Sequence, residues 1–224
     1  MLLKADKIKK NYTRKGNSGD ELDVLKETSF EADEGSFTAI VGRSGGGKST
    51  FMSILSGLLK PDSGKVFYKD LDIYSLNDVK LSKLRNEDFG IVPQDHLILK
   101  SLTVVENILI AREMYGGENG EDEAEELLTK VGLLGYGDYK AEELSGGELR
   151  RLAIARALIN HPKIIFADEP SGDLDDRNTK IIMELFKELA SKGTAVIIVT
   201  HDRDVLEYAD SVYRMDYGVL TKQE

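Results

Sequence analysis

The sequence predicts an α/β protein built on a mostly parallel sheet. Three short runs are almost wholly apolar, at residues 37–41, 163–167 and 195–200, as is typical of strands buried on both faces of a parallel sheet. Helical patterns follow the first run and occupy 148–159 and 177–191, so strands and helices alternate along the chain. In such a sheet we expect ligands to bind at the carboxyl ends of the strands.

The composition is that of a globular protein with an acidic excess. The chain has 224 residues, 41% apolar and 31% charged, which suits one large domain or a domain with a subdomain. Its formal net charge is −10 and no basic stripe is evident, so we expect no nucleic-acid partner. No apolar run reaches the roughly 18 residues that a spanning helix needs, and no signal peptide is evident. Cysteine is absent, which excludes disulfides and thiolate metal sites.

The remaining elements of the core follow from turn residues and alternation. Residues 1–36 are expected to form short strands, with a loop at 15–20. The first helix is expected to continue to about Leu59, because the turn residues of 61–64 come next. The alternation of polar and apolar residues over 65–73 predicts a further strand.

A helical pattern repeatedly broken by glycine distinguishes residues 96–143. The glycines are Gly116, Gly117, Gly120, Gly132, Gly135 and Gly137. We therefore predict a helical subdomain at about 96–143, inserted into a single domain of 224 residues. The core with its β subdomain then comprises 1–95 and 144–224.

A glycine-rich motif directly follows the first apolar strand. It matches the phosphate-binding pattern G-x-x-x-x-G-K-S/T, which requires a strand before it and a helix after it. Its residues are Gly42, Arg43, Ser44, Gly45, Gly46, Gly47, Lys48, Ser49 and Thr50. Backbone N–H groups of such a loop point into one concavity, where Lys48 reaches the β- and γ-phosphates and Ser49 ligates Mg²⁺. The motif predicts a nucleoside triphosphate; the alternative is a glycine-rich turn that binds no nucleotide.

Two adjacent acids end the second apolar strand. Asp168 and Glu169 follow the run 164–167 and should lie at the sheet edge that holds the triphosphate. Asp168 is expected to hold Mg²⁺, usually through water, and Glu169 to orient or deprotonate the attacking water. The alternative is that the two acids only cap the next helix.

A second anion site is indicated at the start of the helix 148–159. Ser145, Gly146 and Gly147 combine a hydroxyl group, free N–H groups and the positive end of a helix. One chain has no evident use for two phosphate cradles on one nucleotide. The economical interpretation is a head-to-tail homodimer, in which this second cradle covers the γ-phosphate held by the other subunit.

The run Leu-Ser-Gly-Gly-Glu at 144–148 resembles the Leu-Ser-Gly-Gly-Gln signature of the ATP-binding-cassette (ABC) ATPases. The match covers essentially the whole chain, and its motifs occur in family order. The resemblance implies hydrolysis of ATP by a P-loop NTPase core with a mostly parallel sheet, an N-terminal antiparallel β subdomain and an inserted α-helical subdomain. It also implies that Ser145, Gly146, Gly147 and Glu148 contact ATP bound by the partner subunit.

The resemblance assigns further roles residue by residue. Gln94 is similar to the Q-loop glutamine that touches Mg²⁺ and the attacking water, and 171–175 resembles the D-loop that meets the partner. His201 resembles the switch histidine at the γ-phosphate, and Tyr12 the aromatic that stacks on adenine. The alternatives are a structural histidine and a core aromatic. The expected catalytic residues are thus Glu169, His201 and Gln94, and the expected metal ligands Ser49, Gln94 and Asp168.

Three positions depart from the family pattern. Glu148 stands where the family usually has glutamine, so the side chain loses an amide donor and brings negative charge near the phosphates. Gly46 replaces a common serine and is expected to add flexibility. The turn 216–218 contains an extra tyrosine, which we expect to be a surface detail.

Membership of this family implies a transporter in which two cassettes serve two membrane subunits. We expect a separate multi-pass permease, and a peripheral position at the cytoplasmic face of the membrane. The permease should contact a groove near 94–103. Arg150 and Arg151 are expected to fix their helix to neighbouring acids.

The segments 72–76, 84–94 and 102–108 look most like the MacB/LolD/FtsE group, which serves export of macrolides or antimicrobial peptides, lipoprotein release and division-linked signalling. The resemblance therefore favours an exporter or extrusion system for a peptide, antibiotic or lipoprotein. The alternatives are an importer cassette, a soluble cassette acting on ribosomes or DNA, and an assembly or regulatory ATPase of the iron–sulfur-scaffold or FtsE-like type. Co-purification of a multi-pass membrane protein would exclude the soluble classes.

Overall fold

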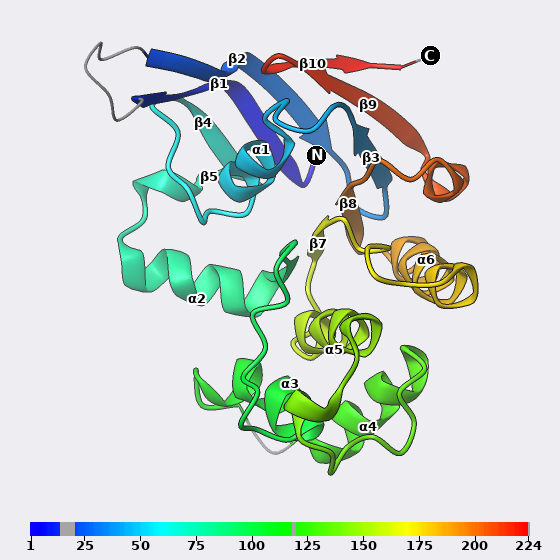
Figure 1. Cartoon of the computed structure of the whole chain (residues 1–224). Helices are drawn as coiled ribbons and strands as arrows, with labels where there is room; N and C mark the ends of the chain where they lie inside the picture. The colour runs from blue at the N-terminus through cyan, green and yellow to red at the C-terminus, as the bar shows by residue number, and fades with distance from the viewer. Residues whose placement is uncertain (14–20, 118–119, 224) are drawn as a thin grey trace.

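The computed structural model describes residues 1–13, 21–117 and 120–223, and the loop expected at 15–20 lies outside them. Its main sheet has the strand order β10-β9-β3-β8-β7-β6 and is parallel except for the β9–β10 pair. The six strands are β3 (Phe37–Val41), β6 (Phe89–Val92), β7 (Ile164–Asp168), β8 (Ala195–Val199), β9 (Ser211–Asp216) and β10 (Val219–Lys222). The predicted mostly parallel sheet is confirmed (Figure 1).

A second, antiparallel sheet lies above helix α1, at the top of Figure 1. Its order is β2-β1-β4-β5, with the strands β1 (Leu3–Thr13), β2 (Glu21–Ala32), β4 (Ser63–Tyr68) and β5 (Leu71–Asp72). The first two strands are long rather than short, because they pair along most of their length. The strand expected at 65–73 is two strands and a 3-10 helix, Ile73–Ser75, because the chain turns back between β4 and β5.

Six α-helices occur in the described part of the chain. They are α1 (Lys48–Leu55), α2 (Asp78–Asp88), α3 (Val104–Glu113), α4 (Glu121–Lys130), α5 (Gly146–Leu158) and α6 (Asp176–Ser191). Helix α1 ends four residues earlier than expected, because the chain leaves the helix at Gly57 in a left-handed conformation (φ 72°). Sequence periodicity did not predict α2, which buries only Leu81 and depends on the Asn77 cap instead.

Two apolar clusters pack on opposite faces of the main sheet. Alternate side chains of β7 face opposite ways: Ile165 and Ala167 join the cluster packed by α3 to α6, while Ile164 and Phe166 join the cluster beneath α1 and the antiparallel sheet. Every residue of β7 and β8 is buried. This double burial explains why the sequence shows continuous apolar runs there rather than alternation.

Helices α3 and α4 pack on α5 at the end of the molecule away from the antiparallel sheet (Figure 1). Among its described residues, the helical region expected at 96–143 therefore contains two α-helices and the 3-10 helix Ala141–Glu143. The division into a helical subdomain at 96–143 and a core at 1–95 and 144–224 stays a prediction.

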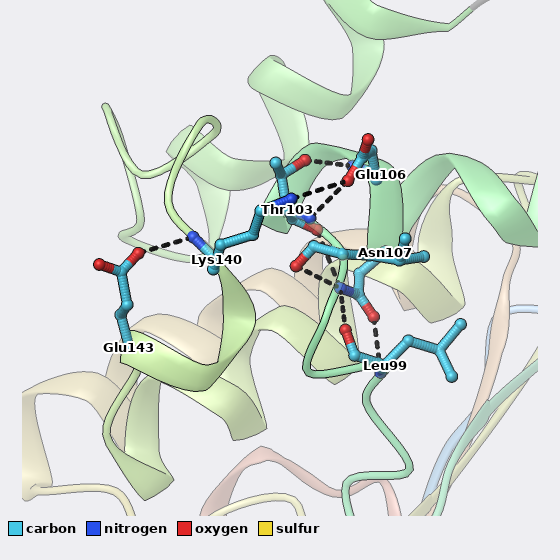
Figure 2. Close-up of polar contacts among 7 residues, drawn as sticks. Leu99, Thr103, Glu106, Asn107, Lys140 and Glu143 are labelled. Carbon is cyan, nitrogen blue, oxygen red and sulfur yellow. Dashed lines mark hydrogen bonds and ion pairs between the residues drawn. The ribbon is translucent and has the colours of Figure 1, made fainter.

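The start of α3 is fixed by polar contacts to the loop that precedes it (Figure 2). Thr103 and Glu106 form a reciprocal capping box. The fully buried Asn107 uses both ends of its amide on the main chain: Nδ2 donates to the Leu99 and Thr103 carbonyls at 3.0 and 2.9 Å, and Oδ1 accepts from the Leu99 N–H at 2.9 Å. The loop 99–103 is thus anchored to the helical region.

Replacing Asn107 should destabilise the protein, because three main-chain hydrogen bonds lose their partner. We expect Asn107→Ala to lower the free energy of unfolding by about 1–3 kcal/mol. The matched control is Lys140→Ala, which removes an exposed ion pair to Glu106 of 3.8 Å and should cost less than about 0.5 kcal/mol. Urea denaturation of both variants tests this; equal shifts of the midpoint would contradict it.

Candidate functional site

A cleft of about 940 Å³ lies where the carboxyl ends of β3, β8, β7 and β6 meet. Because these four strands are parallel neighbours, the segments that follow them emerge at one edge of the sheet. The predicted site residues that line this cleft are Gly42, Ser44, Gly45, Gly47, Lys48, Ser49, Thr50, Gln94, Asp168, Glu169 and His201. The phosphate loop, both acids, the Q-loop glutamine and the switch histidine are therefore brought together.

The remaining predicted residues lie outside that lining. They are Tyr12, Arg43, Gly46, Ser145, Gly146, Gly147 and Glu148. Six residues that the sequence analysis did not place in the site also line it: Val24, Asp95, His96, Arg150 and, from the expected D-loop, Gly172 and Asp173. Val24 and Arg150 reach the cleft because segments far apart in the sequence pack together. No motif in the sequence therefore indicated these two residues.

The phosphate loop is closed by close backbone packing. Gly47 caps α1 in a left-handed conformation (φ 101°), and a Cβ there would lie 2.7 Å from the Val24 carbonyl oxygen. Lys48 Nζ donates to the carbonyls of Gly42 and Arg43 at 2.9 and 3.0 Å. The lysine thus folds back over the loop, where its ammonium group can meet an anion in the cleft.

The turn that connects β9 and β10 is hydrogen-bonded to this loop. The Gly218 N–H donates to the Gly46 carbonyl at 3.2 Å, and the Gly218 carbonyl accepts from Lys26 N and Thr28 Oγ1 at 2.9 Å each. Tyr217 itself is 76% exposed. The expectation that the tyrosine is a surface detail fits its exposed side chain, while the main chain of the turn contacts the phosphate loop.

Asp168 and Ser49 form an oxygen pair beside Lys48. The two side chains are hydrogen-bonded to each other, and burial raises the pKa of Asp168 above its ordinary value. Within the described ranges no group of three or more His, Cys, Asp or Glu side chains has metal-binding geometry. A few hard oxygen donors facing a triphosphate cleft fit Mg²⁺, which keeps waters and takes phosphate oxygens as further ligands.

Glu169 and His201 form a second pair across the cleft. Glu169 has a left-handed backbone (φ 51°), a strained conformation that aims its side chain away from the β7 axis. Its Oε2 lies 2.9 Å from His201 Nδ1, and this hydrogen bond raises the pKa of His201. The carboxylate is mostly buried while the imidazole is exposed, so the histidine covers the acid from the solvent side.

Tyr12 lies near the end of β1 and is 44% exposed. The Lys10 ammonium lies 5.8 Å from the centre of its ring. The alternative of a core aromatic was wrong, since the ring is partly open to solvent. Its role at adenine stays a prediction.

The signature residues cap α5. The Ser145 side chain accepts from Glu148 N at 3.4 Å, while Glu148 Oε2 accepts from Ser145 N at 2.8 Å and from Ser145 Oγ at 2.6 Å. Tyr136 also bonds the Glu148 carboxylate, and these contacts lower the pKa of Glu148. Glutamate at this position thus accepts a hydrogen bond from the Ser145 hydroxyl group within its own chain.

The arginines of α5 bind carbonyls, so the expectation that they pair with acids was wrong. Arg150 donates to the carbonyls of Pro93 and Gln94 at 2.7 and 2.5 Å. Arg151 points elsewhere and donates to the Gly132 carbonyl at 2.7 Å. Consecutive side chains of a helix point in different directions around its axis, so the two neighbouring arginines reach different parts of the protein.

The contact between Glu169 and His201 predicts a measurable titration. In Glu169→Gln we expect the His201 pKa to fall towards its ordinary value, because the charged acceptor of its proton is gone. Asp202→Asn, which removes a smaller charge effect, is the matched control and should lower the pKa less. NMR titration of the imidazole protons measures both, and an unchanged His201 pKa in Glu169→Gln would overturn the assignment.

Comparison with known proteins places this geometry in a family. The ABC transporter family model matches residues 25–172. The lipoprotein-releasing system ATP-binding protein LolD of Saccharophagus degradans is 43% identical over 206 residues, 91% of this chain and 90% of that protein. The macrolide export ATP-binding/permease protein MacB of a Shewanella species is 40% identical over 91% of this chain but 32% of that protein.

Among solved structures, the dimeric ATP-binding cassette MJ0796 in a post-hydrolysis state with ADP and Pi superposes with a TM-score of 0.93. It is 32% identical, and the match covers 100% of this chain and 98% of that one. In residues 1–13, 21–117 and 120–223, every helix is too short or too polar to cross a membrane. The chain therefore belongs to the ABC transporter family, as a cassette that binds and hydrolyses ATP.

Proposed function

We propose that this cassette drives a separate multi-pass permease at the cytoplasmic face of a membrane, as part of an exporter or extrusion system of the LolD/MacB type. LolD and MacB are similar to this chain at 43% and 40% identity, so we infer a cargo that is a lipoprotein, a peptide or an antibiotic. The observation that carries the ATPase chemistry is the cleft in which the phosphate loop faces Asp168, Glu169 and His201.

Within one chain, the residues of the cleft divide the work on ATP. The phosphate loop and Lys48 bind the phosphates, and Tyr12 stacks on adenine. Ser49, Asp168 and Gln94 hold Mg²⁺, which neutralises charge on the β- and γ-phosphates when bound. Glu169 orients the attacking water and accepts its proton. His201, which holds the Glu169 carboxylate in the free chain, contacts the γ-phosphate.

A second chain completes the site. Ser145, Gly146, Gly147 and Glu148 do not line the cleft of their own chain, which supports their acting on the nucleotide of the partner in a head-to-tail dimer. Ser145 must then exchange its hydrogen bond to Glu148 for one to the γ-phosphate. The negative charge of Glu148 near the phosphates disfavours closure, so we expect a dimer that opens readily after hydrolysis.

Trapping the dimer tests the roles of the two chains. Glu169→Gln should bind ATP, lose about a hundredfold or more of its turnover, and form an ATP-dependent dimer, because the base is lost while the charge of the cleft becomes less negative. Adding Ser145→Arg should abolish the dimer and spare ATP binding by the monomer. Size-exclusion chromatography and turnover assays measure this; a Ser145→Arg single variant that still hydrolyses ATP would contradict action in trans.

The segment after Gln94 is suited to receive a cytoplasmic helix of the permease. Leu97 is 69% exposed and Leu99 is 44% exposed, two apolar side chains close together on one loop. Arg156 and Asn107 donate to the main-chain carbonyls of Leu97 and Leu99 themselves. The loop therefore presents apolar surface without having to be ordered on binding, which lowers the entropic cost of docking.

Capture of the partner in the source cell tests the proposed function as a whole. A tagged Glu169→Gln chain held closed with Mg-ATP, extracted in mild detergent, should bring down a multi-pass membrane protein identifiable by mass spectrometry. Leu97→Asp with Leu99→Asp should lose that protein and keep ATP-dependent dimerisation, because charge opposes apolar docking. Capture of a soluble iron–sulfur scaffold or of division proteins instead would favour the assembly or regulatory alternative.

A further inference from the structure

Arg150 is a buried cation at the floor of the nucleotide cleft. Its side chain is 2% exposed, and among the described residues it forms no ion pair with a carboxylate. Its two terminal nitrogens donate to successive carbonyls, those of Pro93 and Gln94. A planar guanidinium group carries two terminal nitrogens and can donate to both oxygens at once. A lysine carries a single nitrogen, which is less suited to binding two separate carbonyls.

Because Arg150 lies in α5, its contact connects the segment around Gln94 to that helix. The helix begins at Gly146, directly after Ser145, so Arg150 lies little more than one turn from the residue expected to cover the partner's ATP. The contact therefore joins the main chain of Gln94, expected at the chain's own nucleotide, to the helix that carries Ser145.

Two more side chains, those of Arg156 and His96, connect the same segment to α5. Arg156 donates to the carbonyls of His96 and Leu97 at 3.0 and 2.8 Å. The ring Nε2 of His96 lies 3.0 Å from the Gly146 carbonyl oxygen and 3.7 Å from Asp173 Oδ2. Beyond Leu97, the Asn107 amide holds Leu99, as Figure 2 shows. The segment 93–99 is thus held to α5 and α3 along its length.

Burial of the guanidinium group is costly, and the surrounding charges offset that cost. Desolvation lowers the pKa of Arg150, while Asp173, Asp168, Asp95 and Glu169 act in the opposite direction. Replacing Arg150 by a neutral side chain would therefore leave two carbonyls without a donor. It would also remove the positive charge that the four nearby carboxylates share.

We propose that Arg150 is a positioning residue that couples the two ATP sites of the dimer. It keeps Gln94 and Ser145 of one chain at a constant separation, so that engagement of ATP by Gln94 in one site sets the position of Ser145 over the other site. This proposal rests on the proposed function, because it takes Gln94 to act in its own site and Ser145 in the partner's.

The first test is the ATP dependence of hydrolysis by the full chain. We expect a Hill coefficient of about 2 in the parent and of about 1 in Arg150→Gln, with turnover lowered about tenfold or more. Binding of a fluorescent ATP analogue by the monomer without Mg²⁺ should weaken by a smaller factor than turnover falls, because the phosphate loop and Lys48 are unchanged. Arg150→Lys should restore part of the turnover, because it keeps the charge but not the paired contact.

Arg151→Gln is the matched control. It removes the same charge from the next position of the same helix, but Arg151 contacts the carbonyls of Val131, Gly132 and Gly147 and not the segment 93–97. We expect it to keep the Hill coefficient of the parent. Thermal unfolding of every variant separates a loss of coupling from a loss of fold, and a properly folded Arg150→Lys carries the test if Arg150→Gln does not fold.

A double-mutant cycle tests whether Arg150 acts through Gln94. In a Gln94→Ala background, Arg150→Gln should lower turnover further by less than about twofold, because the contact has lost the group it positions. Additive losses of turnover in the double variant would overturn the proposal. It would also be overturned if Arg150→Gln and Arg151→Gln had the same Hill coefficient while Ser145→Arg abolished hydrolysis. If Ser145→Arg retains hydrolysis, the action in trans fails instead, and the coupling with it.

Discussion

Parallel pairing of β3, β8, β7 and β6 is the constraint on which the rest of the structure depends. Many residues that line the cleft stand at the carboxyl end of a strand or directly after it, as Asp168 at the end of β7 and Gly42 after β3 do. Because parallel neighbours end at the same edge, four segments widely separated in sequence converge there. A slip of one residue in any pair would move the side chains of a strand to the opposite face of the sheet, so the packing of the two apolar clusters also fixes the register.

Helix α5 connects the parts of the site that the sheet does not connect. Its first turn carries the signature, its inner face enters the cluster packed by α3, α4 and α6, and its arginines hold the segment after β6. Main-chain carbonyls are acceptors that every sequence supplies, so these contacts constrain the position of the segment and leave its side chains free. That freedom allows Gln94 to face the cleft while Leu97 faces solvent.

Two polar groups expected at ATP already have partners within the single chain. Ser145 Oγ donates to Glu148, and His201 Nδ1 is held by Glu169. Dimer closure on ATP therefore exchanges hydrogen bonds rather than adding them, and such exchanges contribute little net free energy. Most of the stabilisation is therefore expected to come from the phosphate charge, which Lys48 and the N–H groups of two helix ends are proposed to meet. Opening after hydrolysis follows naturally, since Ser145 and His201 regain these partners in the free chain.

Much of the site followed from the sequence, because its chemistry depends on residues that lie close together in the chain. The phosphate loop, the pair Asp168 and Glu169, and the signature each combine a strand or helix end with a short polar run, and local rules identify these. The fold class followed from the apolar strands for the same reason. The polar face of α2 gave no periodic signal, so that helix escaped prediction.

Contacts between distant segments were decided by the tertiary structure alone. The turn at Gly218 supports the phosphate loop only because β9 pairs with β3, some 170 residues away in the chain. Arg150 meets the carbonyls of Pro93 and Gln94 rather than an acid because packing of α5 beside β6 brings main chain within its reach. A sequence specifies the side chains that can bind; which main-chain groups stand opposite them depends on how the elements pack.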